Sequence, residues 1–458
     1  MLDAEKTEIF ETMPVPSAVL KLGIPTVISS LVMVLYSLAD TYFVGFLNSP
    51  VQTAAVTYAA PVLLAFNAVN NLFGTGSSSL MSRALGAKDY DTVRRTSAFG
   101  FYSAAFFALV FSSVSLLFMP GLLNILGVDA EAELATRQYM LWTVTLGALP
   151  AILNVVLSFM IRAEGAASQA SIGAAGGCLL NVILDPVFIM PWGFDMGAAG
   201  AGCAPFISNT AATLYFVVLL IKNRSSTFVC VSPRMFSFRK SIVKGTFAVG
   251  VPASIQNLLN VTGMTVLNNL TAPFGAAAVA AMGITHKIDM VPLFVCMGLG
   301  QGLMPLVGYN YSSGNIKRMK QAVFFTLQLT VVFITAASAL MFVFSEGIIS
   351  LFMKNEQIVS FGSAFLRGFC LGLPFLAVDF LGVGIFNALG KGSYSLAFAI
   401  LRKVVLEIPA LIVLNSLLPL FGMAYSQLVA EFVLGIAAVF VTLSLFKKAE
   451  AEKKKEAL

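Results

Sequence analysis

The amino-acid sequence predicts an all-α integral membrane protein with twelve transmembrane helices in two homologous six-helix lobes. Three observations lead to this fold class. Of the 458 residues, 58% are hydrophobic and only 11% are charged, whereas roughly 25% of the residues in a soluble domain are charged. Apolar runs of about 18 residues or more, long enough to cross a bilayer, recur along the whole chain. Several short motifs also occur twice at a nearly constant spacing.

The composition excludes several other classes of protein. The mean hydropathy of +0.88 is too high for a disordered chain or a set of soluble domains. The five cysteines form no CxxC pair, so we interpret them as packing residues. The sequence has no metalloprotease motif, nucleophile elbow or complete phosphate loop. We therefore expect no enzyme activity, no metal, no cofactor and no nucleic-acid partner.

Short polar or glycine- and proline-rich joints divide the chain into twelve apolar runs. Each run is long enough for a transmembrane helix. The expected spans lie near residues 20–46, 53–82, 95–118, 137–161, 168–190, 199–221, 244–271, 277–308, 319–344, 360–388, 394–416 and 423–446.

The Lys and Arg residues indicate the orientation of these spans. If the N-terminus is cytoplasmic, the tails and cytoplasmic connections hold 22 of the 28 Lys and Arg residues. Such a bias is typical of the cytoplasmic side of a membrane protein. We therefore attribute the net charge of +6 to topology. A multi-pass protein of the cell (inner) membrane is expected, with both termini in the cytoplasm.

The same pattern predicts the organisation of the chain. The acidic start lacks the apolar core of a signal peptide, so we expect the first span to be retained. The expected parts are a cytoplasmic N-terminal segment (1–19), an N-terminal lobe (20–221), a basic cytoplasmic linker (222–243), a C-terminal lobe (244–446) and a basic cytoplasmic tail (447–458).

An internal duplication supports the two lobes. The Gly-Ile-Pro of residues 23–25 matches the Gly-Val-Pro of 250–252, and the Gly-Thr-Gly of 74–76 matches the Gly-Gln-Gly of 300–302. Because six crossings are an even number, both halves enter the membrane from the same side. Parallel repeats of this kind are typical of alternating-access transporters. Duplicated channels and scaffolds are the alternatives.

Two acidic residues of the first half lie inside predicted spans, where charge is costly and usually functional. Asp40 follows Tyr36 by four residues, which places both on one helix face. Asp185 follows Asn181 in the same way. A buried carboxyl group that faces a cavity can take up and release a proton. Asp40 and Asp185 are therefore candidates for proton or cation coupling, with Tyr36, Asn181 and Tyr139 as polar neighbours. Alternatively, Asp40 only caps the outer end of its span.

The second half has a larger set of polar and charged residues within its spans. Our candidates for cation or substrate binding are His286, Lys287, Asp289, Asp379 and Gln256. The other intramembrane charges are Arg402, Lys403, Glu407 and Glu431. The signs nearly balance, which favours ion pairs within the lobe. A position near the cytoplasmic end of the span would also lower the cost of Arg402 and Lys403.

Pro25 lies in the first span, fifteen residues before Asp40. Proline interrupts helical hydrogen bonds and produces kinks. We expect a change in the charge of Asp40 to bias a bend at Pro25. A role in packing alone is the alternative.

Four motifs together carry a resemblance to a known family. They are Tyr36 to Asp40 followed by Val44-Gly45, the Gly-Ile-Pro of 23–25, Asn181 with Leu184-Asp185-Pro186, and the stretch from Gly300-Gln301-Gly302 through Pro305 to Gly308-Tyr309-Asn310-Tyr311. In this order, and over nearly the whole chain, they resemble the multidrug and toxic compound extrusion (MATE) transporters. The resemblance implies a V-shaped pair of six-helix lobes. It also implies that the lobes expel organic cations and other amphipathic drugs by cation antiport.

In proton-coupled members of the family, acids of spans one and five take the proton and span one bends at its proline. Carried over, the resemblance assigns these roles to Asp40, Asp185 and Pro25, with Asn181 as a neighbour. A sodium-coupled branch uses acids of the C-terminal lobe, including one in span seven. Span seven of this chain has no acid, although Asp379 leaves sodium coupling open.

The expected function is therefore secondary active multidrug efflux by alternating access. The exported compounds would be lipophilic or cationic, and the exchanged ion would be a proton or, alternatively, sodium. The expected partners are small amphipathic drugs and membrane lipid, and the expected state is a monomer. A lipid-linked precursor flippase of the same superfamily and a membrane-embedded enzyme are the alternatives.

Overall fold

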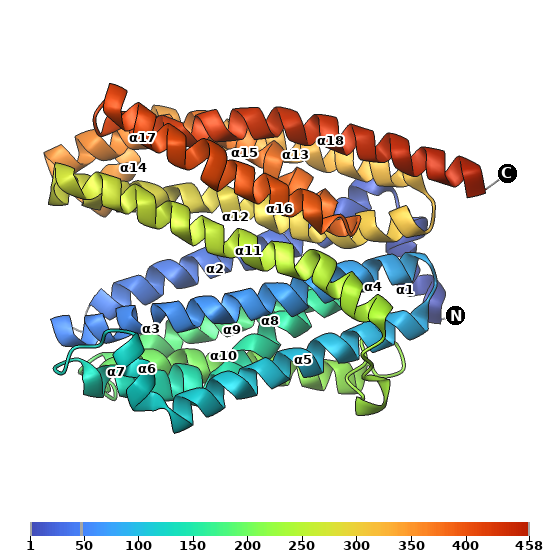
Figure 1. The fold of residues 1–458 in the computed structure, drawn as a ribbon, viewed down its shortest axis with the longest axis horizontal. Helices are drawn as coiled ribbons and strands as arrows, with labels where there is room; N and C mark the ends of the chain where they lie inside the picture. Colours follow the sequence, from blue (N-terminus) through green and yellow to red (C-terminus); the bar gives the residue numbers. More distant parts are fainter. Residues whose placement is uncertain (1, 46–48, 457–458) are drawn as a thin grey trace. The chain divides into compact units, whose positions relative to one another are not determined.

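A computed structural model describes residues 2–45 and 49–456 of the chain. All regular structure in these residues is helical, as Figure 1 shows. The predicted fold class is thereby confirmed. Short π-helical and 3-10 segments, labelled η, interrupt or extend several α-helices.

The elements of the first half are α1 (Leu2–Glu11), α2 (Val15–Gly45), α3 (Pro50–Val69), η1 (Asn70–Thr75), α4 (Gly76–Gly86), α5 (Tyr90–Leu117), α6 (Met119–Ile125), α7 (Glu133–Met140), η2 (Leu141–Leu146), α8 (Ala148–Ala163), α9 (Ala167–Ile189) and α10 (Ala198–Lys222). Those of the second half are η3 (Pro233–Met235), α11 (Lys240–Thr271), η4 (Ala272–Phe274), α12 (Ala276–Ser312), α13 (Ile316–Val343), α14 (Ser345–Phe352), α15 (Glu356–Ala388), α16 (Gly392–Ile400), η5 (Leu401–Glu407), α17 (Ile408–Leu417), η6 (Phe421–Tyr425) and α18 (Ser426–Glu456).

The described residues contain nine helices long and apolar enough to cross a membrane, or ten if the bent pair 133–146 and 148–163 is one span. Two further long helical stretches are more polar. One is α11, which carries several Asn residues, and the other is α16–η5–α17, which carries three charged residues. These two stretches lie at the positions of the two remaining predicted spans.

The chain forms two compact units. The first unit comprises Met1–Ile9 and Ile28–Ser254, and the second comprises Phe10–Val27 and Ile255–Leu458. Both divisions fall within a helix, two residues after Pro25 in α2 and two residues after Pro252 in α11. The repeated proline motif thus marks where each helix passes from one unit to the other.

Glycines of the other repeated motif allow helices to cross closely within each unit. In the first unit, a Cβ atom on Gly76 would clash with the carbonyl oxygen of Thr246 in α11. In the second, a Cβ atom on Gly302 would lie 2.8 Å from the carbonyl oxygen of Leu22 in α2. Only glycine permits backbones to approach so closely. The two motifs therefore have matching structural roles.

The repeat also extends to the capping of helices. The Asp89 side chain accepts a hydrogen bond from the backbone N–H of Thr92 at the start of α5, over 3.0 Å. Asn315 does the same for Arg318 at the start of α13, over 3.2 Å. Such caps satisfy a backbone donor that lacks a helical partner.

Within the second unit, α12, α13, α15 and α18 pack side by side (Figure 1).

Candidate functional site

The first unit brings together the predicted acidic residues and their polar neighbours. Asp40 and Tyr36 lie on α2, Tyr139 on α7, and Asp185 and Asn181 on α9. Asp185 and Asp40 are close enough to interact electrostatically, and Tyr139 interacts with both carboxyl groups. Three helices that are distant in sequence therefore contribute to one polar site.

Two polar side chains of this site, those of Asn181 and Asp185 on α9, have no hydrogen-bond partner among the described residues. Asp185 is fully buried and Asn181 is 2% exposed. Neither carboxyl oxygen of Asp185 and neither polar atom of the Asn181 amide has a partner among the described residues. Buried polar groups in proteins are normally hydrogen-bonded. This site can therefore accept a proton, a small cation or a polar group of a ligand.

Pro25 lies inside α2, which is helical from Val15 to Gly45. The Thr26 hydroxyl donates a hydrogen bond to the carbonyl oxygen of Leu22 over 2.8 Å. This bond engages a carbonyl group in the turn that the proline ring disturbs. The proposed coupling between Asp40 and a bend at Pro25 stays a prediction.

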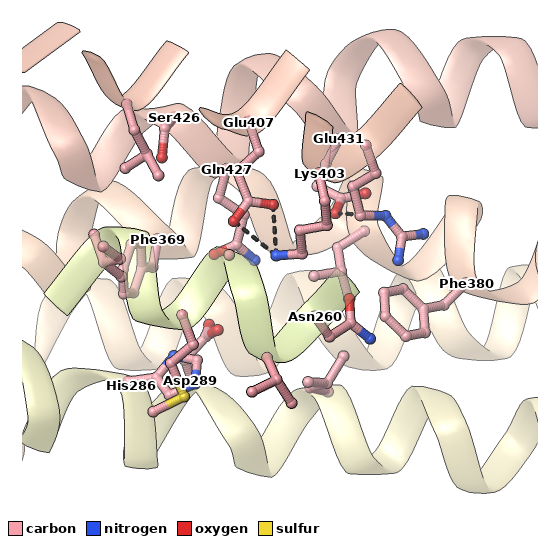
Figure 2. Close-up of a pocket in the computed structure, with 18 of the residues that line it drawn as sticks. Asn260, His286, Asp289, Phe369, Phe380, Lys403, Glu407, Ser426, Gln427 and Glu431 are labelled. Atoms are coloured by element: carbon pink, nitrogen blue, oxygen red, sulfur yellow. Dashed lines mark hydrogen bonds and ion pairs between the residues drawn. The ribbon is translucent and has the colours of Figure 1, made fainter. Parts of the chain in front are cut away.

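The second unit contains a pocket of about 240 Å³ between α11, α12, α15, η5, α17 and α18 (Figure 2). Apolar side chains form part of its wall, including Phe369 and Phe380. The polar side chains that line it are those of Asn257, Asn260, His286, Asp289, Arg402, Lys403, Glu407, Ser426, Gln427 and Glu431.

A buried cluster of three charges lies at one side of this pocket. Arg402 forms ion pairs with Asp379 on α15 and, at 3.3 Å, with Glu431 on α18. All three side chains are at most 2% exposed. The Arg402 guanidinium also lies over the ring of Phe380, 4.3 Å from its centroid. Arg402 thus joins three helices through charge and stacking.

A second ion pair faces the pocket itself. The Lys403 ammonium contacts both carboxyl oxygens of Glu407, at 2.6 and 2.7 Å, and Figure 2 shows its side chain reaching into the pocket. Asp289 lies across from this pair, beside Gln427. It is 4% exposed, and its Oδ1 atom has no hydrogen-bond partner among the described residues. Asp289 is therefore the acid of this pocket best placed to receive a cation.

The π-helical segment η5 carries Arg402, Lys403 and Glu407. Pro409 follows at the start of α17. Because proline has no backbone N–H, it cannot donate the hydrogen bond that a regular α-helix makes to the carbonyl oxygen four residues earlier. The wider π-helical turn accommodates this interruption, as such turns often do at functional sites. The local sequence thus explains why the helix is irregular beside the pocket.

Comparison with known proteins decides the family. The sequence model of the family described as MatE matches residues 25–187 and 252–413, more than half of the chain. The chain belongs to the MatE family. The two matched stretches of MatE sequence begin 227 residues apart, which is the spacing of the Gly-Ile-Pro and Gly-Val-Pro motifs.

Relatives and solved structures agree with this family. The chain is 33% identical over 444 residues to the multidrug export protein MepA of Staphylococcus aureus, covering 96% of each protein. It is 31% identical over 450 residues to MepA of Staphylococcus saprophyticus, covering 98% of each. Two solved MATE structures share the fold. One, in complex with MaL6, has a TM-score of 0.91, 24% identity and coverage of 98% and 99%. The Vibrio cholerae transporter VcmN has a TM-score of 0.85, 20% identity and coverage of 98% of each chain.

The structure of this MatE protein sorts the residues predicted in the C-terminal lobe. His286 and Asp289 line the pocket, and Asp379 lies behind it, bound to Arg402. Gln256 and Lys287 are not among the described residues that line it. Residues one or two positions away on the same helices line the pocket instead.

Arg402 and Lys403 lie ten residues or more after the start of α16 at Gly392, about 15 Å along the axis at 1.5 Å per residue. Both side chains have ion-pair partners there: Arg402 binds Asp379 and Glu431, and Lys403 binds Glu407.

Sequence reasoning also missed a pocket residue. Gln427 lines the pocket one helical turn before Glu431. The signal was a polar side chain one turn from an intramembrane acid, the same spacing that identified Tyr36 and Asn181. Within residues 2–45 and 49–456, no three His, Cys, Asp or Glu side chains are placed to hold a metal ion.

Proposed function

We propose that this MATE protein exports lipophilic and cationic compounds in exchange for protons by alternating access. The two staphylococcal relatives are multidrug export proteins by name and match nearly their full length, which supports drug export over the flipping of lipid-linked precursors. The observation that carries proton coupling is the carboxyl group of Asp185. It is fully buried, has no hydrogen-bond partner among the described residues, and interacts with Asp40.

Asp40 and Asp185 act as the proton-binding pair. A single charge inside the membrane is costly, and a second like charge nearby adds to that cost. Protonation removes both penalties, whereas deprotonation restores them. The proton therefore changes the relative stability of two states of the lobe, which antiport requires.

The pocket of the second unit contributes to binding of the exported compound. Its aromatic walls and the carboxyl group of Asp289 fit the apolar body and positive charge of an organic cation. Its volume of about 240 Å³ is below the range of roughly 300–1,000 Å³ for drug-sized ligands. It therefore holds a small cation or one end of a larger one. His286 is a second polar contact.

We further propose that the protein acts as a monomer in the cell membrane, with both termini in the cytoplasm. The distribution of Lys and Arg residues supports this orientation. The ion gradient is its only source of energy, so no cofactor takes part.

Transport by the purified protein in proteoliposomes tests the coupling ion. The assay follows a fluorescent organic cation while a pH gradient and a sodium gradient are imposed separately. We expect the pH gradient alone to drive transport against the direction of proton flow. Transport driven by sodium alone would contradict the proposal.

Substitutions test the two residues. Asp40→Asn and Asp185→Asn should each abolish pH-driven transport, because neither amide takes up a proton near neutral pH. Asp195→Asn is the matched control. Asp195 is exposed in the loop after α9 and has a φ of +48°, a backbone region that asparagine also tolerates. Undiminished transport by both site variants would refute the assignment.

A further inference from the structure

The segment that joins α10 to α11 is an ordered strap on the first unit. We define the strap as residues 222–244, from the end of α10 to the first turns of α11. It lies at the end of the unit where α5 begins (Figure 1). Between the end of α10 at Lys222 and the start of α11 at Lys240, its only helical element is one short 3-10 turn, Pro233–Met235. Side chains of the lobe therefore fix its path.

Polar side chains of the first unit hold the strap backbone. The carboxyl group of Glu164 accepts hydrogen bonds from the Thr227 hydroxyl at 2.9 Å and from the backbone N–H of Phe228 at 2.7 Å. The Ser97 hydroxyl accepts a bond from the backbone N–H of Cys230 at 2.9 Å. The Tyr102 hydroxyl donates to the carbonyl oxygen of Val231 at 2.8 Å. These bonds fix the strap near residues 227–231.

An aromatic cluster holds the second part of the strap. Phe236 stacks on Phe99 of α5, and Phe238 meets both rings edge-on, with centroids 4.9 to 6.2 Å apart. Phe238 is nevertheless 73% exposed. Phe is among the residues that membrane-surface segments bury at the boundary between lipid headgroups and acyl chains.

The strap is strongly basic. It contains six Lys or Arg residues and no Asp or Glu. All six side chains are exposed, namely Lys222, Arg224, Arg234, Arg239, Lys240 and Lys244. Of these six side chains, only that of Arg239 makes an ion pair with a described residue, Asp91, at 2.9 Å.

We propose that the strap is a binding site for anionic phospholipid headgroups. Its basic residues would bind the headgroup phosphates, and Phe238 would enter the adjacent interfacial region. Clusters of four to eight basic residues beside a membrane helix attract anionic lipid, by about fivefold in affinity for each charge near the surface. The fixed backbone spares the ordering that a disordered basic linker would need on binding lipid.

Fluorescence quenching by brominated lipids tests this site in the full-length protein. The reporter is Phe238→Trp in a background that carries Trp142→Phe and Trp192→Phe, which removes both native tryptophans. The protein is reconstituted in phosphatidylcholine with brominated phosphatidylglycerol or, separately, brominated phosphatidylcholine. We expect the anionic lipid to have at least a fivefold higher relative binding constant at the reporter. The preference should fall as salt rises, because salt screens exposed charges.

Two sets of four substitutions separate the strap from general membrane electrostatics. The strap set, R224Q/R234Q/K240Q/K244Q, should bring the relative binding constant close to one. The tail set, K447Q/K448Q/K453Q/K454Q, removes the same charge elsewhere and should leave the preference in place. Equal quenching by the two lipids, or an equal loss in both sets, would overturn the proposal.

A competition arm identifies the source of the phosphate. Millimolar inorganic phosphate, compared with chloride at the same ionic strength, should leave the quenching preference unchanged. If phosphate abolishes it, the strap binds a free anion and the lipid assignment is wrong. Elution at the same volume in size-exclusion chromatography shows that all variants are folded, so a lost preference reports on lipid binding alone.

Discussion

Replacing Arg402 with methionine should destabilise the second unit strongly. Methionine keeps much of the length of the side chain but removes the positive charge. Asp379 and Glu431 would then remain buried without a counter-ion, since both are at most 2% exposed. The contact between the guanidinium and the ring of Phe380, at 4.3 Å, would also be lost.

The expected cost follows from the burial of these groups. Removing one partner of a buried ion pair typically costs about 3–5 kcal/mol, because the other charge is left uncompensated. The cation–π contact adds roughly 0.5–2 kcal/mol. We therefore expect Arg402→Met to lower the free energy of unfolding by at least 3 kcal/mol. Lys403→Met should cost less, because Lys403 and Glu407 are 17% and 14% exposed.

Reversible unfolding in mixed detergent micelles measures these differences. A charge-free cluster, Arg402→Met with Asp379→Asn and Glu431→Gln, is the decisive comparison. It should recover most of the lost stability, since neutral replacements of buried ion pairs are often tolerated. If the triple variant is as unstable as Arg402→Met, the cost arises from packing and the reasoning fails. The reasoning also fails if Arg402→Met alone is as stable as the unsubstituted protein.

Three further predictions concern contacts within one or the other of the two units. Gly302→Ala should lower stability by about 1–3 kcal/mol, because its Cβ atom would lie 2.8 Å from backbone. Gly300→Ala is the control: its Cβ atom meets no atom within 4 Å, so this variant should not lower stability in the same unfolding assay. Glu164→Ala should release the strap and speed its cleavage by trypsin; a cleavage rate equal to that of the unsubstituted protein would show that the aromatic cluster alone holds it. Tyr309→Phe should lower the free energy of unfolding by about 1–2 kcal/mol, because the 2.5 Å hydrogen bond from the Tyr309 hydroxyl to Glu11 is lost. The ring still stacks on the N-terminal segment. A variant without a measurable change in unfolding would contradict the importance of that bond.

The positions of the helices could be predicted because hydropathy is a local property. The span expected at 277–308 is observed at 276–312, and the one at 95–118 is observed at 90–117. The observed helices extend further mainly where polar residues follow or precede the apolar run. Helical hydrogen bonds continue into water after hydrophobicity ends, so hydropathy cannot locate the ends of a helix.

The ion pairs could not be predicted in the same way. Arg402 finds its partners on α15 and α18, which are 23 and 29 residues away in sequence. The sequence around Arg402 shows only how far this residue lies from the end of its span, and it does not show which distant acids it will meet. Asn257, and not Gln256, lines the pocket for a related reason. One residue turns a helix by about 100°, and hydropathy alone does not show which face of the helix meets the pocket.

The distribution of counter-ions separates acids that already have a buried cation from acids that have none among the described residues. In the second unit, Asp379 and Glu431 share Arg402, and Glu407 has Lys403. An acid that already has a buried cation gains little from a proton or a sodium ion. No ion pair forms at Asp40 or Asp185 within the described residues, so a cation from solution has the most to contribute there.

Asp289 is the intermediate case. It is 4% exposed, and one of its carboxyl oxygens has no hydrogen-bond partner among the described residues, although Lys403 lies within electrostatic range. If the second unit takes part in coupling, Asp289 is therefore the residue to bind the cation, and Asp379 is not. Sodium-type coupling at Asp379 would first require the Arg402 pair to break, which carries the same cost of about 3–5 kcal/mol as removing the arginine. Binding of a single ion would have to supply that energy, whereas proton uptake at Asp185 has no such barrier.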